Sequence, residues 1–166
     1  MLLEILHYPD ERLRNIAQPV TVFDDKIIQI VQDMFETMYH ANGIGLAAIQ
    51  VGIKLRIVTM DLTGSEKKKP VVFINPTLTN VSQETNVYEE GCLSVPGVNE
   101  KVERPKMVTI NAYGMDGKPF SIEADELLST CIQHEIDHLD GKVFIDRISR
   151  LKKSRIDEKI KKSSKV

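Results

Sequence analysis

Residues 134–138 read His-Glu-Ile-Asp-His, an HExxH pattern that places two histidines four positions apart. Each residue of an α-helix turns about 100°, so the two imidazoles lie about 40° apart on one face. Both can bind one divalent metal ion, and the carboxylate of Glu135 can move a proton for a metal-bound water. The pattern therefore predicts a metallohydrolase with His134 and His138 as ligands and Glu135 as proton carrier.

The third ligand must come from another part of the chain. A catalytic metal needs about three protein ligands with one position open, and no third His or Glu follows His138 at the spacing usual for zinc peptidases. Cys92 is the best candidate, because a thiolate binds iron(II) or zinc strongly and Gly91 lets the backbone approach closely. A cysteine is otherwise often a buried small hydrophobe, and packing is our interpretation of Cys131.

A glycine- and alanine-rich stretch, residues 43–52, predicts a turn followed by an extended segment. Small residues suit tight packing around a site. Gln50 is a polar group on this otherwise apolar stretch, and its amide could donate a hydrogen bond to a developing oxyanion.

Hydrophobic periodicity predicts helices around the site. They are a short one at 10–17, a long one from Asp24 or Asp25 to Asn42-Gly43, the HExxH helix from Asp125 to Gly141, and an amphipathic one over 147–161. Strands are predicted at 55–62, 71–74, 78–81, 87–88, 98–102 and 107–113, with turns at 96–97 and 115–117. This order predicts an α+β fold in which short antiparallel strands pack around a central HExxH helix and a further helix follows.

The composition indicates one globular domain over residues 1–166, with 42% hydrophobic and 28% charged residues. No apolar run is long enough to cross a membrane and no secretory signal is evident, so a cytoplasmic location is expected. The net charge of −2 is unevenly distributed, because residues 147–166 carry nine basic and two acidic residues. A basic tail on an acidic body predicts a polyanionic partner.

Three motifs together resemble the peptide deformylase family. That family shows GxGLAAxQ, EGCLS and HExxH in this order, and here they stand at Gly43–Gln50, Glu90–Ser94 and His134–His138. The resemblance covers nearly the whole chain and looks like the bacterial type. It implies hydrolysis of the N-formyl group from the N-formylmethionyl end of nascent chains, which releases formate.

The resemblance also implies roles for single residues. Cys92, His134 and His138 would bind one divalent metal, preferentially iron(II), with zinc, nickel or cobalt as replacements. Glu135 would act as general base and then as acid, while Gln50 and the backbone N–H of Leu93 would stabilise the oxyanion. The residues assigned to substrate binding are Ile44, Gly45, Glu90, Leu127 and Thr130. Thr130 stands where the family often has an aliphatic residue, and Glu90 is expected to form a structural ion pair with Arg104.

Two other functions remain open from the sequence. A zinc peptidase that cleaves internal peptide bonds shares HExxH, but it should lack a cysteine ligand. A non-catalytic metal- or ribosome-binding module is expected to have lost Glu135 or Gln50, and both are present. The basic C-terminal helix could contact ribosomal RNA near the peptide exit, as it does in bacterial deformylases, or could serve solubility alone.

Overall fold

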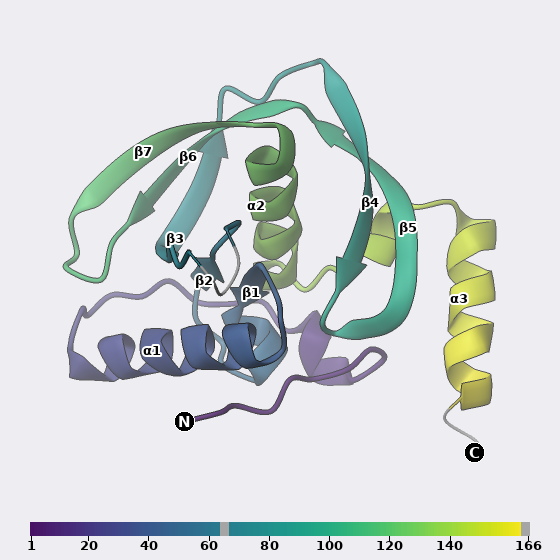
Figure 1. Ribbon diagram of the computed structural model, residues 1–166, viewed down its shortest axis with the longest axis horizontal. Coiled ribbons are helices and arrows are strands. Elements are labelled where there is room, and N and C mark those ends of the chain that lie inside the picture. The colour runs from purple at the N-terminus through teal and green to yellow at the C-terminus, as the bar shows by residue number, and fades with distance from the viewer. Residues whose placement is uncertain (64–66, 164–166) are drawn as a thin grey trace.

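Two antiparallel sheets flank the helix that carries both histidines, as the computed structural model in Figure 1 shows. The structure describes residues 1–63 and 67–163. Its helices are α1 (Asp25–His40), α2 (Glu126–Leu139) and α3 (Arg150–Ser163), with 3₁₀ turns η1 (Glu11–Arg14), η2 (Ala48–Val51) and η3 (Phe144–Arg147). Its strands are β1 (Gly45–Ala47), β2 (Ile57–Met60), β3 (Val71–Thr79), β4 (Thr85–Cys92), β5 (Val95–Pro105), β6 (Met107–Tyr113) and β7 (Pro119–Asp125). The predicted α+β fold is confirmed.

The larger sheet has the order β1-β2-β3-β6-β7, and β4 pairs with β5 in a separate hairpin. α2 lies between the two, with the five-stranded sheet on one side and the hairpin on the other (Figure 1). Its apolar side packs into the sheet, where Ile132 and Leu139 join one buried cluster with Val58 and Ile110. The opposite side of α2 therefore faces the β4–β5 hairpin.

Both ends of α2 lie at the predicted residues. Asp125 occupies the N-cap position, but its side chain makes no capping hydrogen bond. Gly141 follows the helix with φ +76°, a conformation that favours glycine. A Cβ at this position would also lie 2.6 Å from the carbonyl oxygen of Arg14. The chain therefore turns sharply away from the metal helix at Gly141.

α1 confirms the predicted long helix. Asp24 caps it, because its side chain accepts hydrogen bonds from the N–H groups of Lys26 and Ile27. Its buried face packs on β1 and β2, and the cluster includes Met34, Met38, Leu46 and Ile57. α1 thereby supports the short β1 strand that leads to Gln50.

Several predicted elements differ from the structure. The strands expected at 71–74 and 78–81 are one strand, β3, whose register shifts between Ile74 and Thr77 because a local irregularity absorbs the Asn75-Pro76 break. The turn expected at 96–97 lies inside β5, and the hairpin reverses at residues 93–94. The helix expected at 10–17 is the shorter η1, and the extended segment expected over 43–52 is β1 followed by η2.

α3 corresponds to the predicted basic helix, shifted to Arg150–Ser163. Ile156 is its buried residue, and it packs with Val95 and Val102 of β5. Lys165 of the predicted basic tail lies outside the described residues. Among the helices that the structure describes, none has the length and apolar character needed to cross a bilayer.

Candidate metal centre and adjoining pocket

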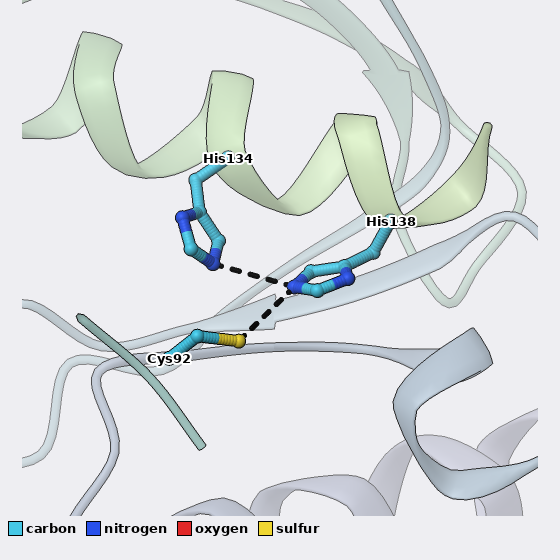
Figure 2. Close-up of side chains that lie close together, drawn as sticks. All are labelled: Cys92, His134 and His138. Carbon is cyan, nitrogen blue, oxygen red and sulfur yellow. Dashed lines mark hydrogen bonds between the residues drawn. The ribbon is translucent and has the colours of Figure 1, made fainter. Parts of the chain in front are cut away.

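Three potential ligand atoms converge between α2 and the end of β4 (Figure 2). The Nε2 atoms of His134 and His138 are 3.3 Å apart, and Sγ of Cys92 is 3.3 Å from Nε2 of His138. The histidines come from consecutive turns of α2, and Cys92 is the last residue of β4. The structure thus brings together the three residues that the sequence predicted as ligands.

The spacing of these atoms suits a single tetrahedral metal ion. Two nitrogens that each lie about 2.1 Å from such an ion are about 3.4 Å from each other, close to the 3.3 Å between the histidines. Burial lowers the pKa of His138 well below its ordinary value, so this imidazole is neutral, the form that binds metals. A thiolate with two imidazoles selects a transition metal over calcium or magnesium. The site can therefore hold one divalent transition-metal ion.

A chain of buried charges orients His134. Its Nδ1 lies 2.9 Å from Oε1 of Glu90, and Arg104 holds the same carboxylate with two hydrogen bonds of 2.7 and 3.0 Å. Arg104 also donates to Asp137 at 2.9 Å, and Arg147 donates to Asp137 at 2.6 and 2.8 Å. The expected Glu90–Arg104 ion pair is present and buried. Because Nδ1 faces a carboxylate, Nε2 of His134 is directed at the other two ligands.

The carboxylate of Glu90 is fully engaged by these partners. Burial alone would raise the pKa of Glu90, but the hydrogen bonds from His134 and Arg104 outweigh burial and lower it. Glu90, which the resemblance assigned to substrate binding, is thus placed to orient a metal ligand and also lines the adjoining pocket.

Glu135 is buried beside the ligands and faces β1. A Cβ on Gly45 would collide with Oε2 of Glu135, so the absence of a side chain at residue 45 makes room for this carboxylate. Burial raises the pKa of Glu135 to about 7. Within residues 1–63 and 67–163, Oε1 of Glu135 and Nδ1 of His138 are the buried side-chain atoms that lack a hydrogen-bond partner. A carboxyl group with such a pKa and a free oxygen can exchange a proton near neutral pH.

Gln50 reaches the site from η2, not from a strand. Its Oε1 accepts from the N–H of Ala47 at 2.9 Å, which fixes the amide so that Nε2 points toward the hairpin. Nε2 lies 3.0 Å from Oγ of Ser94 and 3.5 Å from Sγ of Cys92. Leu93 stands between these two residues at the hairpin turn. Gln50 Nε2 therefore approaches Cys92 from η2, and Leu93, the other predicted oxyanion donor, follows Cys92 directly in the chain.

A pocket of about 460 Å³ opens beside the metal ligands. The other predicted site residues line it, and they are Ile44, Gly45, Gln50, Glu90, Leu93, Leu127, Thr130 and Glu135. His138 is fully buried. Cys131 also lines the pocket, but it packs against the core and burial raises its pKa to about 12, which keeps the thiol protonated.

The sequence did not predict the roles that Tyr88, Ser94, Asp137 and Arg147 have at the site. Asp137 carried a usable signal, because a charged residue on the buried face of the metal helix needs a charged partner. Arg147 pairs with Asp137 from the end of η3, a short irregular segment beyond α2. Neither helical nor strand spacing relates the two residues, so the sequence did not predict this pair.

Two imidazoles, a cysteine thiol and an unpaired buried carboxyl beside a pocket define a mononuclear metallohydrolase type of site. A family model described as polypeptide deformylase matches residues 2–154. The chain belongs to the peptide deformylase family. It is 56% identical over 164 residues to the peptide deformylase of Chromobacterium violaceum. The aligned region covers 99% of this chain and 97% of that protein. It is 54% identical over 161 residues to the peptide deformylase of Pseudomonas aeruginosa. That aligned region covers 97% of this chain and 95% of the relative.

Solved structures agree with this assignment. The crystal structure of a peptide deformylase from Legionella pneumophila is similar with a TM-score of 0.93 and 45% identity, covering 99% of this chain and 96% of that one. The peptide deformylase from Ehrlichia chaffeensis in complex with actinonin is similar with a TM-score of 0.92 and 38% identity, covering 99% of both chains. The family removes the N-formyl group from the N-terminal methionine of nascent proteins.

Proposed function

We propose that Cys92, His134 and His138 hold one divalent ion at which this protein, a peptide deformylase, hydrolyses the N-formyl group of nascent polypeptides. The observation that supports this assignment most strongly is the convergence of three ligand atoms within 4.8 Å of one another beside a pocket lined by Glu135. Residues 1–166 would form one catalytic domain. When bound, a divalent ion polarises the formyl carbonyl and lowers the pKa of water.

Glu135 moves the proton of the reaction. As general base it takes a proton from the attacking water, and as general acid it passes that proton to the nitrogen of the leaving amine. The carbon–nitrogen bond of the formamide breaks, which gives formate and a free amino terminus. The pKa of about 7 supports both roles, because the group can be present in either form near neutral pH.

Gln50 and Leu93 stabilise the negative charge that develops on the formyl oxygen. The Gln50 amide is held by Ala47 and Ser94, so its N–H is already oriented before substrate binds. The backbone N–H of Leu93 is the second donor. Donors that need no reorganisation lower the barrier most effectively.

The pocket receives the methionine side chain. Ile44 and Leu127 are large apolar residues that stay 40% and 43% exposed, which leaves them free to cover an apolar group. Thr130 adds a methyl group and a hydroxyl. The backbone of Gly45 offers hydrogen bonds to the substrate chain, and Glu90 lines the pocket while it supports His134.

Iron(II) is the metal that we propose, with zinc, nickel or cobalt as functional replacements. An iron–thiolate site should be sensitive to oxygen, because Cys92 can be oxidised. The iron-loaded protein should lose activity in air with Cys92 oxidised, whereas the nickel-loaded protein keeps its activity. Equal stability of both forms would argue against iron as the working metal.

Formate release tests the function directly. The substrate is formyl-Met-Ala-Ser, the control is acetyl-Met-Ala-Ser, and the protein is purified anaerobically and loaded with iron(II). We expect rapid release from the formyl peptide alone, because a formyl group presents a smaller carbonyl head than an acetyl group. No release from a protein with one metal per chain would contradict the proposal.

We also propose that α3 contacts ribosomal RNA, which agrees with a cytoplasmic location. Arg155, Lys159 and Lys162 are exposed and stand at the i, i+4 and i+7 spacing of one helix face. Deletion of α3 would remove Ile156 from the core, so substitution is the cleaner test. The triple change to Gln should weaken ribosome binding and lower its salt dependence, with unchanged hydrolysis of tripeptides. Unchanged ribosome affinity would contradict this contact.

A further inference from the structure

Alternate residues of β4 contact α2 at two separate levels. At the lower level Glu90 meets His134 and Cys92 meets His138. At the upper level Tyr88 reaches Glu126, the first residue of α2. Side chains two positions apart lie on the same face of a strand, so one face of β4 makes all these contacts. Figure 1 shows β4 beside α2 along this length.

The upper contact is held from several sides. The Tyr88 hydroxyl donates to Oε2 of Glu126 at 2.7 Å, and the amide of Asn86 donates to the same oxygen at 3.1 Å. Nζ of Lys106 lies 3.9 Å from the other oxygen. Glu126 has φ +47°, a left-handed conformation that is disfavoured for a residue with a side chain. Such a conformation persists where its surroundings hold it, and it is often associated with a functional site.

The pocket lies between these two levels. Glu126 and His134 are eight residues apart on α2, which corresponds to about 12 Å along the helix. Leu127, Thr130 and Cys131 line the pocket within this interval, and Tyr88 lines it from β4. The hydroxyl of Tyr88 is bound to Glu126, whose side chain is 53% exposed. The phenol ring therefore lies between the pocket that it lines and the exposed carboxylate of Glu126.

We propose that Tyr88, held by Glu126, is the end wall of the side-chain pocket and sets the length of the N-terminal side chain that the enzyme accepts. This inference rests on the proposed assignment of the pocket to the methionine side chain. Tyr88 is a specificity-determining residue that touches no reacting atom. Glu126 is a positioning residue that acts through Tyr88.

The test compares formyl-X-Ala-Ser peptides in which X is norvaline, norleucine, methionine or 2-aminooctanoic acid. For each enzyme the readout is kcat/KM relative to formyl-Met-Ala-Ser. This ratio does not depend on the fraction of protein that is active, so partial loss of folded protein in a variant leaves it unchanged. In Tyr88→Ala we expect the ratio for 2-aminooctanoic acid to rise at least tenfold, because one methylene in an apolar pocket changes kcat/KM by about tenfold or more.

Matched variants distinguish the role of the Tyr88 ring from the role of its hydrogen bond to Glu126. Tyr88→Phe keeps the ring but removes the hydroxyl that donates to Glu126, and Glu126→Ala removes the carboxylate that accepts this hydrogen bond. Both variants should change the kcat/KM ratio for 2-aminooctanoic acid by a few-fold only. Glu126→Gln retains an oxygen acceptor and should keep the wild-type profile. Thr85→Val removes the contact between Thr85 and Glu103 on the same hairpin, outside the pocket, and should change nothing.

The outcomes are distinguishable. An unchanged length profile in Tyr88→Ala, with formyl-Met-Ala-Ser still hydrolysed, overturns the role of Tyr88 and leaves the deformylase assignment intact. Failure of the wild-type protein to hydrolyse any formyl peptide overturns the proposed function and this inference with it.

Discussion

Arg147 donates two hydrogen bonds, of 2.6 and 2.8 Å, to Asp137, the residue that precedes the metal ligand His138. Asp137 also accepts from Arg104, which holds Glu90 against His134. Two carboxylates and two guanidinium groups therefore balance one another behind the metal ligands. Without Arg147, Asp137 would depend on Arg104 alone, and Glu90 would compete with it for the same guanidinium.

Replacement of Arg147 should therefore disturb the metal site as well as the fold. In Arg147→Met we expect a loss of about 2 kcal/mol in unfolding free energy, because a mostly buried carboxylate loses two charged hydrogen bonds. Zinc affinity should fall about tenfold, since His134 is held less firmly. Urea unfolding and chelator competition measure the two effects.

Arg56→Met is the matched control, because Arg56 pairs with Asp140 at the exposed end of α2. A surface pair of this kind contributes about 0–1 kcal/mol, and zinc affinity should stay at the wild-type value. If Arg147→Met also keeps wild-type zinc affinity, the network stabilises the fold without orienting the ligands.

Gly45→Ala should remove activity without removing metal. The added Cβ collides with Oε2 of Glu135 and forces the carboxylate to move. A displacement of about 1 Å can cost about 100-fold in rate, so we expect kcat to fall by that order. Gly114→Ala is the control, since it lies on the β6–β7 hairpin. If Gly45→Ala keeps a kcat near the wild-type value, the exact position of the Glu135 carboxylate does not determine the rate.

Glu135→Ala should abolish turnover and spare the metal. Removal of a general acid–base group typically costs about 10²–10⁴ in rate. Metal analysis by mass spectrometry should still give one ion per chain, because the carboxylate is not a ligand. Substoichiometric metal in this variant would show that the assigned role is wrong.

The lowered pKa of Asp146 should make the unfolding free energy decrease at acid pH. Burial alone would raise its pKa, but hydrogen bonds from Arg14, the Val143 N–H and Lys153 outweigh burial and lower it to about 2. The folded-state pKa is below the unfolded value of 3.8, so this stabilisation is complete above about pH 4 and is lost as the pH falls toward 2. Urea unfolding should show Asp146→Asn to be about 1 kcal/mol less stable than wild type at pH 6, after allowance for solvent screening. The difference should shrink at pH 3. A difference independent of pH would exclude the charge as its cause.

The sequence predicted the parts of the site that depend on local spacing. The periodicity around His134 and His138 defines a helix with both ligands on one face, and the structure has that helix. The contacts that depend on distant pairing could not be predicted in the same way. Asp137 and Arg147 approach because Gly141 turns the chain after α2, and this geometry leaves no periodic signal.

Two errors in the predicted strands have local causes. Gly97 has φ +76°, which is typical of a turn, yet it lies inside β5. Asn75-Pro76 also suggested a break, but β3 absorbs it because Asn75 adopts φ +52° and bonds the backbone of Val20. In both cases the residues that favour a turn lie at an irregularity of the strand pairing, and the pairing continues on either side of it.

The alternating side-chain directions in β4 limit which changes in its sequence the enzyme can tolerate. Tyr88, Glu90 and Cys92 occupy positions of equal parity, so a shift of one residue would turn all three away from α2 at once. An inserted or deleted residue in β4 would then remove a metal ligand and the orientation of another together with the end of the pocket. A change in β4 that alters the pocket and keeps the metal site is therefore an exchange of the side chain at position 88, with the number of residues in the strand unchanged.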